Sequence, residues 1–460
     1  MTKNDIYTKK NFSSILWNCH NIIRGNDKLS PEAAFDEISK VLFIKIFKER
    51  YYPSSEGVYG CEEYKREKEQ HNASTPLVPY YQQLFHETKE KYADDEIFEK
   101  TEKLRIKERS FESILTELET YNLASIDDDV KGVAFESFLS KTFRGELGQF
   151  FTPRTIVDFM VNVLDPKFGD KICDPCCGSG GFLIKAYEHV RQQINMDHPT
   201  DAELKIRELS NKQIYGTDAN PRMARIAKMN MIMHGDGHSG VFHHDGLLNI
   251  GNIEDGTFDV IITNPPFGAR IDKNSKITEE DGLPENYWGK KIVSLYKISK
   301  YSTATEVLFI ERCLNLLKPG KRMGIVLPEG VLGNGNMKRV REFVEARARI
   351  LLVVSLPVEV FASAGASVKS SIVFLQKFTE EERKQRETYT KGIVKILKSE
   401  KKYTDKEIAD RVAISLRTHF SYDVPMSEIQ YAGIDAQGDD AKNQLPELLI
   451  EFKKYCSNQG

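Results

Sequence analysis

The sequence predicts an α/β protein with a parallel sheet covered by helices on both faces, a helical domain before it and a charged helical region after it. Two observations predict this class. Short apolar runs alternate with helical stretches between residues 146 and 380, as in successive βαβ units. The flanking stretches have helical spacing and more charge. We therefore expect an N-terminal helical domain at 1–145, a sheet domain at 146–380 and a C-terminal region at 381–460.

The composition excludes several classes of protein. Over 460 residues, 40% hydrophobic and 29% charged side chains are typical of a globular protein rather than a disordered or fibrous one. The net charge of −3 argues against binding a polyanion through bulk charge. No apolar run approaches the roughly 18 residues of a membrane span. The first residues lack the apolar core of a signal peptide, and the seven cysteines are scattered, so we expect a cytoplasmic protein with reduced thiols and no membrane contact.

The first 145 residues are predicted to be helical. Ser30-Pro31 is a typical helix start, since serine caps the helix and proline tolerates the first helical position. The apolar residues that follow at helical spacing are Phe35, Ile38, Val41 and Leu42. We expect a surface loop over Pro53–Pro79 and a charged helix over Glu87–Leu118. This domain fits either a structural bundle or a clamp on nucleic acid.

Seven apolar segments fit β-strands: Lys171–Asp174, Gln213–Asp218, Val241–Asp245, Asp259–Asn264, Met323–Pro328, Ile350–Leu356 and Ser370–Gln376. The helices expected between them are Phe182–Ile194, Pro221–Met233, Glu306–Leu317 and Lys338–Ala348. Ligands of such a sheet bind at the carboxyl ends of its strands. The connection Pro357–Lys369 is too short for a helical crossover, so the last two strands should be antiparallel.

The C-terminal region is charged and mostly helical. We expect helices at Thr379–Glu387, Lys398–Arg411 and Leu445–Tyr455, with a polar break at Gly433–Asp440. The segment Ala269–Thr305 is a polar insertion within the sheet domain, which fits a surface loop and a DNA contact equally well.

Polar or glycine-rich residues follow three of the predicted strands. Asp174-Pro175-Cys176-Cys177-Gly178-Ser179-Gly180-Gly181 joins a strand to a helix, and its glycines allow a sharp turn and close approach of a ligand. This loop fits a dinucleotide, a methyl donor or a tight turn. Asp218 is placed to accept both ribose hydroxyls of an adenosine-containing ligand, or to cap the next helix. Asp245 is placed to receive an adenine amino group, or to form a turn.

The fourth strand end, Asn264-Pro265-Pro266-Phe267, is the most specific. Two prolines fix two φ angles and remove two N–H donors. The Asn264 side-chain oxygen and the Pro265 carbonyl can then accept hydrogen bonds from one NH₂ group. Phe267 offers a face on which a flat base can stack. A structural turn rarely needs all three features.

Together these elements resemble the modification (M) subunits of type I restriction–modification systems, a family of adenine-N6 DNA methyltransferases with a Rossmann-like class I S-adenosylmethionine-dependent methyltransferase domain. Gln149-Phe150-Phe151-Thr152-Pro153-Arg154 resembles that family's FTP motif, and Lys318–Leu332 resembles a later segment. The motifs occur in the family's order and cover most of residues 10–380. Cys176-Cys177 departs from the small apolar residues that are usual there.

The resemblance implies a cofactor, partners and residue roles. S-adenosylmethionine would be the methyl donor. Its binding residues would be Gln149, Phe150, Phe151, Thr152, Pro153, Arg154, Asp174, Gly178, Ser179, Gly180, Asp218 and Asp245. The catalytic set that holds a flipped adenine would be Asn264, Pro265, Pro266 and Phe267. The partners would be double-stranded DNA, a specificity (S) subunit, a second M subunit and a restriction (R) subunit, with the charged C-terminal helices as candidates for the S-subunit contact.

Other functions remain open at this point. The same proline turn occurs in methyltransferases that act on amide or amino nitrogens of proteins or RNA. A non-catalytic subunit that binds S-adenosylmethionine only for structure is a second alternative, and a dinucleotide oxidoreductase is a third. The cluster of Cys173, Cys176 and Cys177 lacks a fourth ligand for zinc, so we expect no metal and read these cysteines as small buried side chains.

Overall fold

The computed structural model describes residues 9–53, 57–74, 78–93, 97–126, 131–132, 134–135, 138–139, 142, 152–197, 199–235, 240–364, 368–400, 402–435 and 440–459. The chain forms two compact units. The first comprises Met1–Leu147 and Arg225–Ser239, and the second comprises Gly148–Ala224 and Gly240–Gly460. The domain limits expected near residues 145 and 380 remain predictions.

The described part of the first unit is helical, as the sequence predicts. Its helices are α2 (Lys9–Asp27), α3 (Pro31–Tyr51), α4 (Cys61–Ser74), α5 (Tyr80–Lys91) and α6 (Glu108–Glu117). Ser30 caps α3, because its hydroxyl accepts a hydrogen bond from the backbone N–H of Ala33 at 3.3 Å. The expected helix start is therefore confirmed.

Two expectations about this unit are wrong. The predicted loop Pro53–Pro79 contains α4, which the buried Tyr64 anchors by ring contacts with Tyr80 and Phe111. The predicted helix Glu87–Leu118 is interrupted, because α5 ends at Lys91 and α6 begins only at Glu108. The buried carboxylate of Glu37 accepts hydrogen bonds from the backbone N–H groups of residues 105 and 106, which stabilises the non-helical segment.

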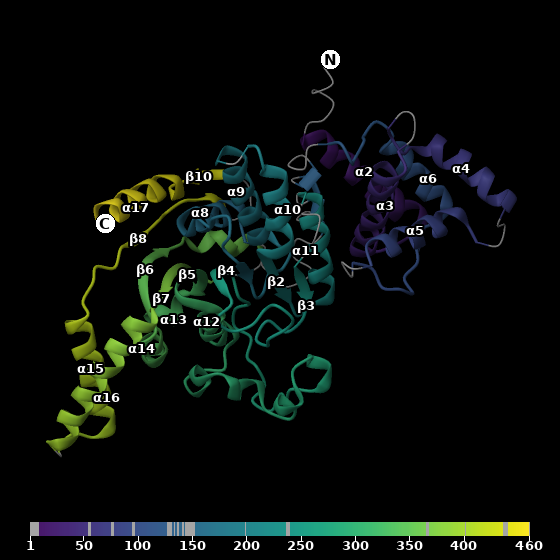
Figure 1. Ribbon diagram of the computed structural model, residues 1–460. Coiled ribbons are helices and arrows are strands. Elements are labelled where there is room, and N and C mark those ends of the chain that lie inside the picture. The colour runs from purple at the N-terminus through teal and green to yellow at the C-terminus, as the bar shows by residue number, and fades with distance from the viewer. Residues whose placement is uncertain are drawn as a thin grey trace. The chain divides into compact units, whose positions relative to one another are not determined.

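The second unit contains an eight-stranded sheet (Figure 1). Its strands are β1 (Ile172–Asp174), β2 (Ile214–Asp218), β3 (Val241–His243), β4 (Phe258–Thr263), β5 (Leu317–Pro328), β6 (Ala348–Ser355), β7 (Ser370–Lys377) and β8 (Met426–Glu428). The order is β3-β2-β1-β4-β5-β7-β6-β8. Strands β1 to β5 are parallel, and β7 is antiparallel to both β5 and β6. The predicted sheet and the predicted antiparallel pair are confirmed, and β8 is an additional edge strand.

Helices cover both faces of this sheet (Figure 1). They are α8 (Arg154–Leu164), α9 (Gly181–Asp197), α10 (Ala202–Lys212), α12 (Thr305–Leu316), α13 (Glu329–Gly333) and α14 (Lys338–Glu345). Helix α11 (Pro221–Met233) begins in this unit and continues into the first unit from Arg225. The sequence predicts α9, α11, α12 and α14 but not α8, α10 or α13. The strand order reverses between β1 and β4, and this switch point is where doubly wound sheets bind ligands.

Short 3₁₀ turns occupy much of the insertion after β4: η1 (Glu279–Asp281), η2 (Glu285–Tyr287), η3 (Ile292–Leu295) and η4 (Lys297–Lys300). Two more, η5 (Gly335–Met337) and η6 (Val358–Ala364), lie after α13 and β6. Buried Ile277, Tyr296 and Ile298 join this insertion to the core of the unit. The insertion is therefore packed structure rather than a plain loop.

The C-terminal region contains α15 (Glu380–Ser399), α16 (Asp405–His419), β9 (Ala432–Ile434), β10 (Asp440–Asn443) and α17 (Leu445–Gln459). The predicted helix Lys398–Arg411 begins too early, because α15 continues to Ser399 and Thr404 caps α16 in a capping box. The predicted break contains the end of β9, and its residues 436–439 lie outside the described residues. The final helix is confirmed. Within the described ranges, every helix is too short or too polar to cross a membrane.

Candidate active site

Asp174 ends β1 at the switch point and is almost fully buried. Its Oδ1 accepts hydrogen bonds from the Thr263 hydroxyl at 2.6 Å and from the backbone N–H of Cys176 at 3.1 Å. Its Oδ2 has no hydrogen-bond partner in the part of the chain that the structure describes. Burial raises the pKa of this carboxyl group to about 7, since the two hydrogen bonds offset only part of the lost hydration. The unpaired Oδ2 is an acceptor available to a ligand.

The glycine loop follows Asp174 and leads into α9. Gly178 and Gly180 have φ angles of 54° and 84°, which other residues rarely adopt. Ser179 lies between them, and α9 begins at Gly181. The backbone N–H of Gly178 donates to Asp218 Oδ2 at 3.0 Å, so the loop is attached directly to the end of β2. This is the geometry expected of a loop that approaches a ligand through its backbone.

The sequence allows Asp218 either to cap the next helix or to bind a ligand, and in the structure Asn220 is the residue that caps the helix. The side chain of Asn220 caps α11, because its Oδ1 accepts from the N–H groups of Arg222 at 2.9 Å and Met223 at 3.4 Å. Asp218 instead accepts from the N–H groups of Gly178 and Asn220. Burial raises the pKa of Asp218, although both hydrogen bonds favour the charged form. The helix-capping reading of Asp218 is therefore wrong.

Asp245 lies two residues beyond the end of β3, not at its last residue as the sequence suggests. Its Oδ1 accepts from the backbone N–H of Leu247 at 2.9 Å, which is typical of a turn. The next residue, Gly246, packs so closely on the glycine loop that a Cβ there would overlap the Pro175 carbonyl oxygen. Asp245 thus reaches the same edge of the sheet as Asp174 and Asp218, on a turn that only glycine allows.

The elbow Asn264–Phe267 follows β4, whose six residues are all buried. Asn264 is partly exposed, Pro265 is buried and Pro266 is exposed, so the elbow is open to solvent. The Asn264 Nδ2 donates to the Thr152 hydroxyl at 3.0 Å. Its Oδ1 is buried and has no hydrogen-bond partner among the described residues. An incoming N–H donor can therefore bind there without displacing a protein contact.

Thr263 connects the elbow to the glycine loop. Its hydroxyl donates to Asp174 Oδ1 and lies 2.9 Å from the sulfur of Cys176. Because Thr263 directly precedes Asn264, the two sequence motifs lie next to each other at the carboxyl edge of β1 and β4. The sequence interpretation depends on this proximity.

Helix α12 fixes the other side of the elbow. The Thr305 hydroxyl donates to the Pro266 carbonyl at 2.8 Å, and the Gly268 N–H donates to the Glu306 carboxylate at 3.2 Å. Both contacts flank Phe267, whose ring meets Phe361 edge to face with centroids 6.2 Å apart. Sequence reasoning missed Thr263, Thr305 and Glu306. Threonine and glutamate at positions 305 and 306 are typical of a helix start. That pattern does not predict a contact with the elbow.

The FTP element is described only from Thr152 onward. Gln149, Phe150 and Phe151 lie outside the described residues. Thr152 contacts Asn264, as given above. The Pro153 carbonyl accepts from the N–H groups of Ile156 and Val157 in α8, and Arg154 is the exposed first residue of that helix. The element therefore joins the start of α8 to the elbow.

The cysteines of the glycine loop are not arranged as metal ligands. Cys173 and Cys177 are buried, as expected, and Cys176 is partly exposed. Burial raises the pKa of all three thiols, so they are protonated at neutral pH. In the described ranges, no group of three or more histidine, cysteine, aspartate or glutamate side chains could hold a metal ion.

Comparison with known proteins identifies the family. The model of the N-6 DNA methylase family matches residues 126–431. The EcoEI type I restriction enzyme methylase subunit of Escherichia coli is 33% identical over 238 residues, which are 51% of this chain and 43% of that protein. The MjaIX methylase subunit of Methanocaldococcus jannaschii is 30% identical over 321 residues, 69% of this chain and 51% of that protein. The chain thus spans about half the length of these relatives.

The fold has a solved counterpart. A chain of a type I restriction–modification system superposes with a TM-score of 0.57 at 23% identity, and the match covers 80% of this chain and 75% of the other. The predicted fold class, a Rossmann-like methyltransferase domain with added helical regions, is confirmed. Since the family model covers more than half of its residues, the chain belongs to the N-6 DNA methylase family.

Proposed function

We propose that the protein is an adenine-N6 DNA methyltransferase that uses S-adenosylmethionine, and that it acts as the modification subunit of a type I restriction–modification system. One observation carries the proposal. The unpaired Asn264 Oδ1 lies at a strand end that the Thr263–Asp174 hydrogen bond ties to the glycine loop. An acceptor for an amino group thus lies beside a loop suited to a nucleoside-containing donor.

The residues present fit S-adenosylmethionine. The Asp174 Oδ2 is a buried acceptor without a partner, and Gly178 and Gly180 expose backbone at the start of α9. These residues would hold the methionine end, Asp218 the ribose and Asp245 the adenine. The FTP residues Gln149–Arg154 would border the methionine moiety. When bound, S-adenosylmethionine supplies an electrophilic methyl group on a sulfonium.

The elbow would position and polarise the target nitrogen. The lone pair of adenine N6 is delocalised into the ring, so N6 is a poor nucleophile. Asn264 Oδ1 and the Pro265 carbonyl would accept hydrogen bonds from its NH₂ group and direct a lone pair toward the methyl carbon. The same acceptors stabilise the positive charge that develops on nitrogen. Phe267 would stack on the flipped base and offset part of the few kcal/mol that flipping costs.

The proposed partners follow from the relatives, which are methylase subunits of type I restriction enzymes. We propose that double-stranded DNA is the substrate, that a specificity subunit selects the site, and that a second modification subunit and a restriction subunit complete the assembly. We also propose that the protein acts in the cytoplasm, because the DNA of bacteria and archaea lies there.

Substitution of Asn264 tests the proposal. Asn264→Ala should lower the transfer of tritiated methyl groups from S-adenosylmethionine to unmethylated DNA at least about 100-fold, because one preorganised acceptor is lost. The assay includes a co-expressed specificity subunit. Cofactor affinity by calorimetry should stay within about twofold, since Asn264 does not bind the donor.

Asp218→Ala serves as the opposite control and should weaken cofactor binding. A wild-type protein that methylates no DNA would contradict the function, whereas methyl transfer by Asn264→Ala at the wild-type rate would contradict only the role of the elbow.

A further inference from the structure

A cavity lies near the amino ends of β5 and β6, away from the carboxyl ends of β1 and β4 where the candidate active site lies. Its volume is about 470 Å³, within the range of small-molecule sites. Strands β5, β6 and β7 form its floor, and the ends of α8 and α17 form its walls together with segment 422–425. None of the residues assigned to methyl transfer lines it.

Three polar side chains form a row on the floor of this cavity. Arg322 of β5 pairs in register with Gln376 of β7, which pairs with Arg349 of β6. Directly paired residues of neighbouring strands point to the same face of a sheet. The guanidinium groups of Arg322 and Arg349 therefore lie on either side of the Gln376 amide, on strands that are separated by β7.

This row has unused hydrogen-bonding capacity. Arg349 donates to the Glu382 carboxylate at 3.0 Å, but Arg322 has no carboxylate or hydrogen-bond acceptor among the described residues. Gln376 donates its Nε2 to the Gly320 carbonyl, which leaves its Oε1 as an acceptor. A guanidinium offers five N–H donors in a planar fork that matches carboxylate and phosphate groups. The Arg322 guanidinium can therefore donate hydrogen bonds to an anionic ligand.

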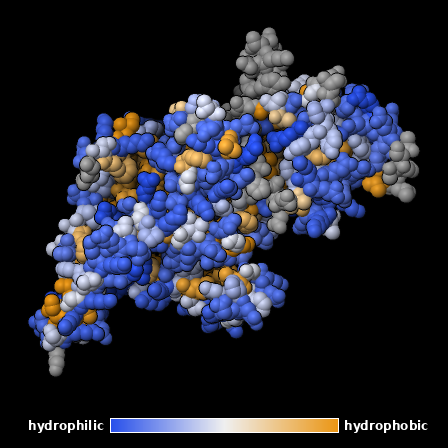
Figure 2. Space-filling view, in the orientation of Figure 1, coloured by the Kyte–Doolittle hydropathy of each residue, from blue (hydrophilic) through white to orange (hydrophobic). Residues whose placement is uncertain are grey.

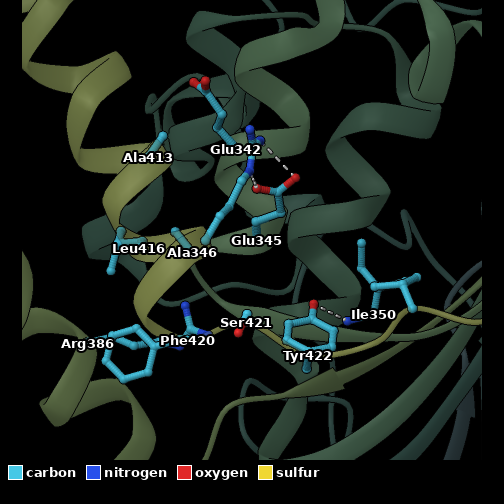
Figure 3. Close-up of a pocket in the computed structure, with 12 residues that line it drawn as sticks. Glu342, Glu345, Ala346, Ile350, Arg386, Ala413, Leu416, Phe420, Ser421 and Tyr422 are labelled. Atoms are coloured by element: carbon cyan, nitrogen blue, oxygen red, sulfur yellow. Dashed lines mark hydrogen bonds and ion pairs between the residues drawn. The ribbon is translucent and has the colours of Figure 1, made fainter.

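Aromatic side chains also line this cavity. Phe452 and Tyr455 of α17 line it on one side and Tyr422 on another. Tyr422 is held in place, because its hydroxyl accepts a hydrogen bond from the Ile350 N–H at 3.0 Å (Figure 3). The Arg349 guanidinium lies 5.5 Å from the Tyr422 ring centre. Planar ligands stack on such rings, so the cavity combines anion donors with stacking surfaces.

A further cation, Arg386, lies near Tyr422 in a smaller cavity that Glu342 and Glu345 also line. Figure 3 shows the smaller cavity, of about 260 Å³, that shares Tyr422 and Ile350 with the larger one. There Arg386 lies against Phe420, with 4.5 Å between the guanidinium carbon and the ring centre, and it has no ion-pair partner among the described residues. Asp423 is the one carboxylate that lines the larger cavity. Because Glu382 already pairs with Arg349, Arg322 is the guanidinium of the larger cavity that remains available to an anionic ligand.

We propose that the larger cavity binds a nucleotide, with its phosphate on Arg322 and Arg349 and its base against Phe452 and Tyr455. Gln376 Oε1 would accept a hydrogen bond from the ligand. The phosphate explains the unpaired guanidinium, and the base explains the aromatic walls. The nucleotide can be free or part of a single strand, since both present the same phosphate and base.

Calorimetry with adenosine 5′-monophosphate tests the site in the full-length protein, with S-adenosylhomocysteine present to occupy the cofactor site. Arg322→Gln should weaken binding about tenfold or more, because a charge-assisted hydrogen bond is lost. Arg207→Gln, the same change at an exposed arginine of α10, should leave the affinity unchanged. Asp218→Ala should also leave it unchanged, since Asp218 belongs to the cofactor site.

The Cys456 thiol gives a second readout that does not depend on activity. Cys456 is exposed and lines the cavity. Adenosine monophosphate should slow its alkylation by iodoacetamide, measured by peptide mass spectrometry, and Arg322→Gln should remove this protection while Arg207→Gln retains it. Competition by a six-nucleotide oligothymidylate would assign the site to a strand, and its failure to compete would assign the site to the free nucleotide.

Three results would overturn the proposal: no binding by the wild type, unchanged binding by Arg322→Gln, or equal affinity for inorganic phosphate and for the nucleotide. None of them bears on methyl transfer, which Arg322→Gln should perform as the wild type does.

Discussion

At the scale of single residues, Asp174 joins the two halves of the candidate active site. One carboxylate oxygen is bound by Thr263 and Cys176, and the other is unpaired and buried. Burial raises its pKa to about 7. The free protein therefore contains a carboxyl group that is partly protonated at neutral pH, at the point where the glycine loop meets the elbow.

Asp174→Asn should change how the stability of the free protein depends on pH. The carboxyl group titrates near pH 7 in the folded state and at about 3.9 in an unfolded chain. Ionising this carboxyl group is less favourable in the folded state than in the unfolded state. The free energy of unfolding of the wild type therefore falls as the pH rises from about 4 to about 7. Asparagine can still accept the Thr263 hydrogen bond but does not ionise. The fall in Tm between pH 5 and pH 8 should be smaller in the variant by about 5 °C.

Thermal unfolding without DNA or cofactor measures this difference. Parallel Tm profiles of the variant and the wild type would mean that Asp174 is ionised throughout, contrary to its burial. The comparison with the variant cancels the contributions of titrating groups that do not interact with Asp174.

The residue scale also separates what sequence can reveal from what it cannot. Asp174, Asp218 and Asn264 are polar residues at the ends of apolar runs, so they stand out as exceptions to the local pattern. Thr263 does not stand out, because threonine is ordinary in a strand. Its role depends on a hydrogen bond to a residue 89 positions earlier, which only the pairing of β1 with β4 creates.

At the scale of elements, the sheet was more predictable than the helices. Strands buried on both faces are continuous apolar runs, so the sequence reveals β1, β2, β4 and β7 nearly to the residue. Helix α10 buries only Leu209 and Ser210 and has little apolar signal. The false helix at 87–118 has good helical composition, but hydrogen bonds from its backbone to Glu37 stabilise a different conformation.

Helix α12 provides the prediction at this scale. Thr305→Val should lower kcat for methyl transfer about tenfold, because the Pro266 carbonyl loses the donor that fixes the elbow. Thr305→Ser keeps the hydroxyl and should restore most of the rate. Cofactor affinity should not change in either variant, since the Thr305 hydroxyl bonds the elbow, its continuation and Glu306 rather than a residue assigned to the cofactor.

The pair of variants distinguishes positioning from general stability. A loss of rate in both variants, or a loss of cofactor binding together with the rate, would assign Thr305 to folding instead. Glu306 makes the neighbouring contact to Gly268 and provides an independent check of the same clamp.

At the scale of the whole second unit, helices α15 and α16 form a hairpin that docks on α14. Arg417 of α16 makes two hydrogen bonds with Glu345 of α14, at 2.7 and 3.0 Å, and Lys338 pairs with Asp410 at 3.0 Å. The sequence predicts charged helices here. It cannot predict this docking, because a charged side chain can either be exposed to water or form an ion pair with a neighbouring helix. Two large apolar side chains stay exposed on the hairpin, Ile396 at 57% and Ile414 at 62%.

The exposed apolar residues fit the predicted role of this region in binding the specificity subunit. Figure 2 shows hydrophobic atoms at the end of the molecule where Figure 1 places α15 and α16. Charged helices that carry isolated apolar side chains are suited to an interface with an apolar centre and a polar rim. The hairpin presents such a surface without using the candidate active site.

Ile414→Asp therefore should weaken co-purification of the specificity subunit with the affinity-tagged protein, because a charge replaces an apolar contact at the interface. Ile396→Asp should do the same if both side chains meet one partner. Leu204→Asp, at a side chain of α10 that is 67% exposed, is the matched control and should retain the subunit. All three variants should bind S-adenosylmethionine with wild-type affinity by calorimetry, which verifies that the sheet domain is folded.

Retention of the specificity subunit by the Ile414→Asp, Ile396→Asp double variant would place the contact elsewhere on the molecule. Loss of the subunit by Leu204→Asp would point to a broader interface that includes α10.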